Sequence, residues 1–115
     1  MTKQITITIG QGVDRDGKSL SYRLPDLKRE ALVLTAKVLG GYTATESRGG
    51  WIDPRGNLIE ENSLVITSIV PEESVNAVKT LAKLLGEIFN QEQVMVVVST
   101  VESEFIEIIP DSKVA

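Results

Sequence analysis

The sequence predicts an α+β domain in which an antiparallel sheet carries two helices on one face. Three observations lead to this fold class. An alternating segment opens the chain, two later stretches place apolar residues at helical spacing, and the remaining ordered stretches resemble strands, in the order β-α-β-β-α-β. With 115 residues the chain has the size of one domain. We take this domain as residues 1–115, with a polar tail from 110 to 115.

The first strand and helix follow from simple patterns. Residues 3–9 alternate, with Ile5, Ile7 and Ile9 on one face and polar residues on the other. Residues 10–23 are rich in Gly, Asp and Ser, as loops are, and Pro25 then suits the first turn of a helix. Gly40 and Gly41 end this helix. Its predicted buried stripe consists of Leu24, Leu27, Ala31, Leu34 and Val38.

The second half of the chain predicts a hairpin, a helix and a final strand. Residues 42–48 and 58–70 should pair around Trp51, and a helix begins after Pro71. Residues 94–98 are apolar without alternation, which predicts a central strand, and residues 102–109 should extend the sheet. The buried face of the second helix is predicted as Val75, Val78, Leu81, Leu85 and Ile88 or Phe89.

This order is that of the ferredoxin-like fold, whose sheet keeps one face free of helices. On that face the sequence places several threonines, which are Thr6, Thr8, Thr43 and Thr45. A polar, threonine-rich sheet face is suited to contact with a second copy of the chain. We therefore expect a homo-oligomer.

Composition restricts the function classes. The net charge is −4 with acids spread along the chain, so no basic surface is available for long nucleic acids. The chain has no Cys and no His, which excludes disulfides, Ser-His and Cys-His nucleophile pairs and the usual zinc sites. We expect a protein that is not an enzyme and uses no cofactor. A small enzyme working with Asp, Glu, Lys, Tyr or Arg is the alternative. No apolar run approaches a membrane span or a signal peptide, so a cytoplasmic protein is expected.

Residues 12–19 match the phosphate-loop pattern G-x-x-x-x-G-K-S. In a true phosphate loop the Lys-Ser pair starts a helix, whereas Pro25 places the helix start later, and Asp14 and Asp16 would repel phosphate. Asp14, Asp16 and Ser19 also resemble part of a calcium loop, but the distal Glu is missing. The sequence favours a plain surface loop and predicts no metal site.

The predicted ligand site lies around the only tryptophan. Arg48 and Arg55 flank Trp51 and Asp53, and an indole beside guanidinium groups suits a nucleobase with phosphates. We predict that Arg48, Trp51, Asp53 and Arg55 bind a small anionic ligand, with a signalling nucleotide as the favoured case. In the alternative reading Trp51 packs on one end of the sheet, and the chain is a protein-interaction or structural module without a ligand pocket.

The same stretch carries a resemblance. Gly49-x-Trp51-x-Asp53-x-x-Gly56, followed by Glu61 and Ser63, resembles the hairpin of a family of small uncharacterised bacterial and phage α+β proteins, over residues 40–100. More loosely, the short acidic chain is similar to phage anti-defence proteins that sequester cyclic-nucleotide immune signals, such as the anti-Thoeris proteins. This second similarity implies an anti-defence protein that retains a nucleotide without turning it over.

Overall fold

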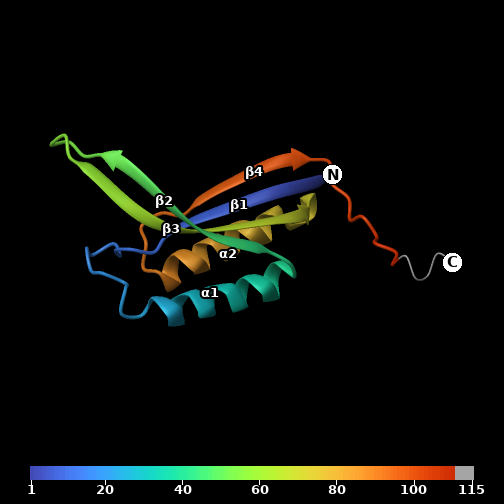
Figure 1. The fold of residues 1–115 in the computed structure, drawn as a ribbon, viewed down its shortest axis with the longest axis horizontal. Coiled ribbons are helices and arrows are strands. Elements are labelled where there is room, and N and C mark those ends of the chain that lie inside the picture. Colours follow the sequence, from blue (N-terminus) through green and yellow to red (C-terminus); the bar gives the residue numbers. More distant parts are fainter. Residues whose placement is uncertain (111–115) are drawn as a thin grey trace.

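A computed structural model describes residues 1–110 and shows the ferredoxin-like fold that the sequence predicts (Figure 1). Its elements are β1 (Thr2–Gly10), α1 (Leu24–Leu39), β2 (Thr43–Ile52), β3 (Leu58–Pro71), a 3-10 turn (Glu72–Ser74), α2 (Val75–Ile88) and β4 (Met95–Val101). All neighbouring strands are antiparallel, and their order across the sheet is β2-β3-β1-β4. Both helices lie on the same side of the sheet (Figure 1). Apart from Pro110, the predicted polar tail lies outside the described residues.

The core lies between the sheet and the helices. Ile5, Ile7 and Ile9 of β1 are buried, as their alternation predicts, and pair with neighbours that face the same way on β3. On α2 the predicted face is confirmed, since Leu81 and Leu85 are buried. The other buried apolar residues are Leu20, Leu27, Ala31, Leu64, Ile66, Val70, Val78, Ala82 and Phe89.

The predicted stripe of α1 is wrong at its C-terminal end. Thr35 is buried, and its hydroxyl donates to the carbonyl of Ala31 at 2.8 Å, whereas Val38 is exposed. A hydroxyl that bonds its own helix backbone can be buried without an unpaired donor. The helix therefore continues its buried stripe through Leu27, Ala31 and Thr35.

Two predictions about the C-terminal part are also wrong. β4 is an edge strand that pairs only with β1 in the described sheet, although its apolar sequence predicted a central one. Met95 and Val97 lie on the helix-free face and are exposed there. Residues 102–110 form no strand and leave the sheet instead of extending it (Figure 1). Apolar character on both faces of a strand therefore does not identify a central strand in this chain.

The hairpin of β2 and β3 is longer than predicted, and its end projects from the body. We call residues 49–60 the arm and residues 102–110 the C-terminal segment. They leave opposite ends of a molecule whose principal extents are 66 × 30 × 27 Å (Figure 1). Within residues 1–110, no helix is long and apolar enough to cross a membrane.

Candidate functional site

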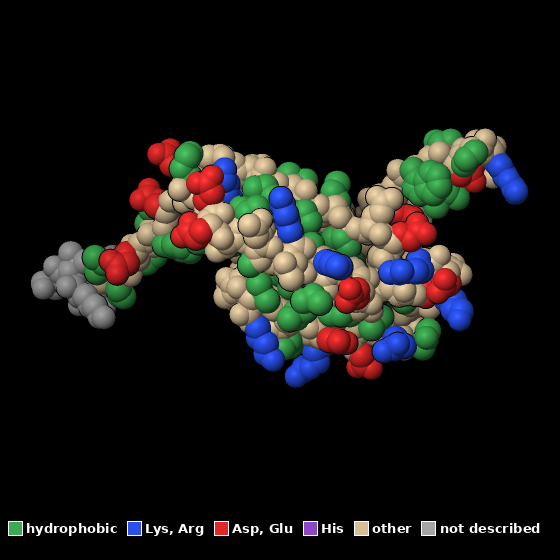
Figure 2. All heavy atoms as spheres, turned by 180° about the vertical axis from the view of Figure 1, so that it is seen from behind, with side chains coloured by type: hydrophobic (Ala, Val, Ile, Leu, Met, Phe, Trp, Pro, Cys, Tyr) green, Lys and Arg blue, Asp and Glu red, His purple; other side chains and the backbone are tan. Residues whose placement is uncertain are grey.

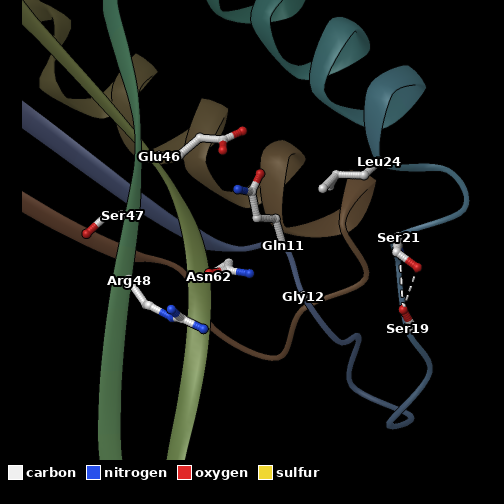
Figure 3. A pocket seen from close by; sticks show the side chains of 9 residues that line it. All are labelled: Gln11, Gly12, Ser19, Ser21, Leu24, Glu46, Ser47, Arg48 and Asn62. Carbon is white, nitrogen blue, oxygen red and sulfur yellow. Dashed lines mark hydrogen bonds between the residues drawn. The ribbon is translucent and has the colours of Figure 1, made fainter.

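A cavity of about 490 Å³ lies where the arm joins the body. Its walls come from β2, from β3, from the segment after β1 and from the start of α1 (Figure 3). The volume is within the usual range of small-molecule sites, about 300–1,000 Å³. The lining residues are Gln11, Gly12, Ser19, Ser21, Leu24, Glu46, Ser47, Arg48 and Asn62.

Strand register puts the charged groups of the cavity on one face. Glu46 pairs with buried Leu64, and Arg48 pairs with Asn62, so these residues share the helix-side face of the sheet. The carboxylate of Glu46 forms an ion pair with Lys28 of α1. The guanidinium of Arg48 lies 3.3 Å from a carboxylate oxygen of Glu60, in an exposed pair. The cavity thus holds one anionic and one cationic group on alternate positions of β2.

Gln11 is the most unusual residue of the cavity. It follows β1, its backbone N–H donates to the carbonyl of Asn62 at 3.0 Å, and the residue is only 2% exposed. Within residues 1–110, its side-chain oxygen Oε1 has no hydrogen-bond partner. The amide group points toward Glu46 (Figure 3). A buried acceptor left unpaired costs about 1–3 kcal/mol, so this oxygen is suited to accept a hydrogen bond from a ligand.

The loop that lines the cavity is held by hydrogen bonds within itself and to Asn90, which follows α2. One carboxylate oxygen of Asp14 accepts from the backbone N–H groups of Asp16 and Lys18, and the other accepts from Asn90. The N–H of Lys18 is the largest cause of a lowered pKa at Asp14, and the amide of Asn90 lowers the pKa further. Ser19 does not start a helix, because α1 begins at Leu24. The loop is thus fixed while Ser19 and Ser21 face the cavity.

The structure separates the predicted site residues. Arg48 lines the cavity, whereas Trp51 lies on the arm and is 50% exposed. Asp53 caps the turn at the tip of the arm, where its carboxylate accepts from the N–H groups of Arg55 and Asn57 at 2.9 and 2.8 Å. Ligand binding by these four residues stays a prediction.

Sequence reasoning did not single out Gln11 and Asn62. Asn62 lies in the middle of a polar run, and Gln11 opens a loop, so neither had a neighbour in sequence to mark it. Glu46 likewise has no motif around it in the sequence. The available signal was the register of the hairpin, which places Glu46 opposite Leu64 on the helix-covered face of the sheet. Within residues 1–110, no cluster of three or more His, Cys, Asp or Glu could hold a metal ion.

Solved structures similar to this chain include an enzyme. A phage SAM lyase in complex with S-methyl-5′-thioadenosine is 25% identical, with a TM-score of 0.62 over 85% of this chain and 80% of that one. A phage SAM lyase in the apo state is 24% identical, with a TM-score of 0.58 over 91% and 92% of the two chains. The periplasmic divalent cation tolerance protein CutA from Archaeoglobus fulgidus shares the fold at 11% identity, with a TM-score of 0.57 over 91% and 88%. No curated protein matches the chain.

The similarity to a SAM lyase shows that the prediction of a protein without enzymatic activity is wrong. The absence of His and Cys removes the commonest nucleophiles and bases, but it does not remove reactions that need neither. The predicted resemblance to a small α+β family is confirmed, because a family model matches residues 30–105 and spans the Trp51 hairpin. The chain belongs to the DUF3574 family of proteins of unknown function.

Proposed function

We propose that this protein binds S-adenosylmethionine in the cavity between β2 and the loop after β1, and that it cleaves this substrate to S-methyl-5′-thioadenosine. The observation that carries the proposal is the 25% identity, over 85% of the chain, to a SAM lyase in complex with S-methyl-5′-thioadenosine. The groups in the cavity support it, because they match the charges that this substrate carries.

S-adenosylmethionine combines a positive sulfonium, a carboxylate, an ammonium group and a neutral adenine. Glu46 supplies the negative charge that a sulfonium favours, and Arg48 supplies a planar cation for the carboxylate. The unpaired oxygen of Gln11 accepts a hydrogen bond from a donor such as the adenine amino group. Both groups are paired in the free protein, Glu46 with Lys28 and Arg48 with Glu60, and both are more than half exposed, so a second oxygen of Glu46 and further N–H groups of Arg48 can face a ligand while these pairs remain.

The reaction fits a site without His or Cys. The bond between the sulfonium sulfur and the γ-carbon of the methionine part breaks, and its electron pair stays on sulfur, which gives a neutral thioether. The carboxylate oxygen of the substrate attacks the same carbon and forms homoserine lactone. No water, proton or redox partner is consumed. The competing elimination needs a base to remove a proton from the β-carbon, and the cavity's only carboxylate, within the described residues, is already paired with Lys28.

In this mechanism the protein acts by binding and orientation. Arg48 holds the carboxylate so that its oxygen can reach the γ-carbon, and holding two reacting groups together accelerates such ring closures. Glu46 holds the positive sulfonium in place until the bond between sulfur and the γ-carbon breaks. An anti-defence role and a cytoplasmic location accord with this proposal, since loss of S-adenosylmethionine deprives methyltransferases of their methyl donor.

The test is incubation of the purified chain with S-adenosylmethionine, followed by mass spectrometry of the products. We expect S-methyl-5′-thioadenosine and homoserine lactone in equal amounts. Glu46→Gln and Arg48→Ala should lower kcat/KM about 10- to 100-fold, because each removes a charged hydrogen-bond partner. Arg29→Ala is the matched control, since Arg29 lies in a separate groove on α1, and it should retain full activity.

Three outcomes would contradict the proposal. Recovery of intact S-adenosylmethionine bound to the protein would show binding without turnover. A vinyl amino acid in place of the lactone would show elimination and therefore a base. If the protein neither binds nor cleaves S-adenosylmethionine, the alternative predicted from the sequence is favoured, which is a protein-interaction module without a ligand pocket.

A further inference from the structure

The described chain exposes far more surface than a compact monomer of its mass. Its accessible surface is 8179 Å², whereas a monomer of 12.5 kDa should expose about 6,200 Å². Its radius of gyration is 17.3 Å, against about 13 Å for a compact domain of this length. The excess of about 2,000 Å² on one chain is more than the roughly 800 Å² that each partner buries in a stable protein interface.

One source of the excess is the arm. Trp51 pairs with Ile59 on one face, and Ile52 pairs with Leu58 on the other, so the arm carries apolar side chains on both faces. Ile52 and Leu58 are exposed, as is half of Trp51. An isolated two-stranded ribbon is marginally stable in water, because it cannot bury its side chains. The outer edge of β2 also has no neighbouring strand in the described sheet.

The other source is the C-terminal segment. Phe105 is fully exposed, Ile108 is 82% exposed, and Ile106 and Ile109 are exposed as well. Phe105 and Ile109 alternate with Ile106 and Ile108, so an extended segment presents apolar groups on both faces. It carries three glutamates and no Lys or Arg over residues 102–110. This pattern is that of a strand that has no partner in its own sheet.

The two features lie at opposite ends of the molecule, so one chain cannot bring them together. Figure 2 shows hydrophobic side chains together with acidic and basic ones at the end of the arm, and hydrophobic and acidic ones where the C-terminal segment leaves the other end. Nine extended residues span about 30 Å, which matches the ten residues of β2 at about 33 Å. The C-terminal segment and the arm are both apolar on both faces, whereas residues 43–48 of β2 are mostly polar, so the apolar part of the contact lies at the arm.

We propose that the C-terminal segment of one copy adds as a strand to the outer edge of β2 in a second copy. The contact joins two different surfaces, so the assembly closes as a reciprocal dimer or a small ring. Strand addition of this kind pairs the free backbone groups of an edge and buries alternate side chains. It also places residues of the second copy along Glu46, Ser47 and Arg48, which form one wall of the cavity. The cavity is therefore completed by a neighbouring subunit.

Light scattering combined with size exclusion tests this arrangement with two double variants of the full chain. F105D/I108D alters only the C-terminal segment, and W51D/L58D alters only the arm. We expect the wild type to be a multimer and each variant alone to run as a monomer of 12.5 kDa. An equimolar mixture should form a one-to-one dimer, because each variant keeps the surface that the other has lost. Lys79→Asp, at an exposed residue of α2 outside the arm and the C-terminal segment, should keep the wild-type mass.

Hydrogen exchange gives a second reading that does not depend on the arm variant. Amides on the outer edge of β2 should be protected in the wild type and should exchange in F105D/I108D, while the amides of β1 stay protected in both. A monomeric wild type at micromolar concentration would overturn the proposal. So would variants that keep the wild-type mass, or variants that fail to pair when mixed.

Discussion

Gln11 shows a conflict between stability and function at a single side chain. Its oxygen is buried without a partner in the free protein, in a cavity that otherwise offers paired charges. Local departures from good packing of polar groups are expected at functional sites, where a ligand supplies the missing partner. Asp14 shows the reverse case, since all its bonds stabilise the loop and leave nothing for a ligand.

Gln11→Leu should stabilise the free protein and weaken ligand binding. The substitution removes the unpaired acceptor, so the free energy of unfolding should rise by about 1 kcal/mol. Binding of S-methyl-5′-thioadenosine should weaken about tenfold, because its donor loses the acceptor. Chemical denaturation and calorimetry measure the two effects. Gln4→Leu, at an exposed position of β1, serves as the control, and equal binding by wild type and Gln11→Leu would contradict the role of Gln11.

At the scale of elements, the hairpin and α2 show two different sources of order. The tip of the hairpin is fixed locally, since Asp53 accepts two backbone N–H groups and Gly56 adopts a positive φ of 85° that glycine tolerates. The orientation of α2 is fixed by burial, since its apolar face meets β1 and β4. A turn can therefore form far from any core, while α2 depends on the sheet beneath it.

Two adjacent leucines on α2 allow the effect of burial on stability to be measured apart from helix propensity. Leu85 is fully buried and Leu84 is 40% exposed, so they have the same chemistry in different surroundings. Leu85→Ala should lower the free energy of unfolding by about 2–5 kcal/mol, because it removes buried apolar contacts and leaves a cavity. Leu84→Ala should change it by less than about 1 kcal/mol. Denaturant titration of both variants tests the helical register of α2. Similar losses in the free energy of unfolding for the two variants would contradict this register.

At the scale of the whole molecule, the sheet has more exposed apolar surface than the sequence suggested. The helix-free face carries the predicted threonines, and with them Val65, Ile69, Met95 and Val97. The arm and the C-terminal segment extend this surface to both ends of the long axis (Figure 1). The sequence predicts a homo-oligomer from these threonines, and the exposed apolar surface supports it further. We place the proposed contact at the outer edge of β2, the arm and the C-terminal segment.

Trp51 offers an intrinsic probe of this assembly, because it is the only tryptophan. In a single chain half of its side chain is exposed, and a strand added to β2 would cover it. Its emission should shift to shorter wavelength as protein concentration rises through the assembly range. F105D/I108D should show the emission of the dilute wild type at every concentration. An emission maximum independent of concentration in the wild type, together with a multimeric mass, would place the contact away from the arm.

The order of elements could be read from local patterns alone. The alternation of Ile5, Ile7 and Ile9, the spacing of Leu81 and Leu85 and the hairpin around Trp51 each depend on neighbours in sequence, and each is found as expected. Composition restricted the nucleophiles, but it could not exclude catalysis, because a reaction between two parts of one substrate needs no nucleophile from the protein.

Tertiary structure decided what depends on contacts between distant segments. The position of β4 at the edge, the burial of Thr35 and the exposure of Phe105 depend on which surfaces meet, and short patterns do not encode this. The cavity has the same origin. Gln11, Glu46 and Asn62 lie on three separate segments, and only the register of the sheet brings their side chains to one place. Local spacing thus determined the elements of this protein, and long-range pairing determined its candidate site.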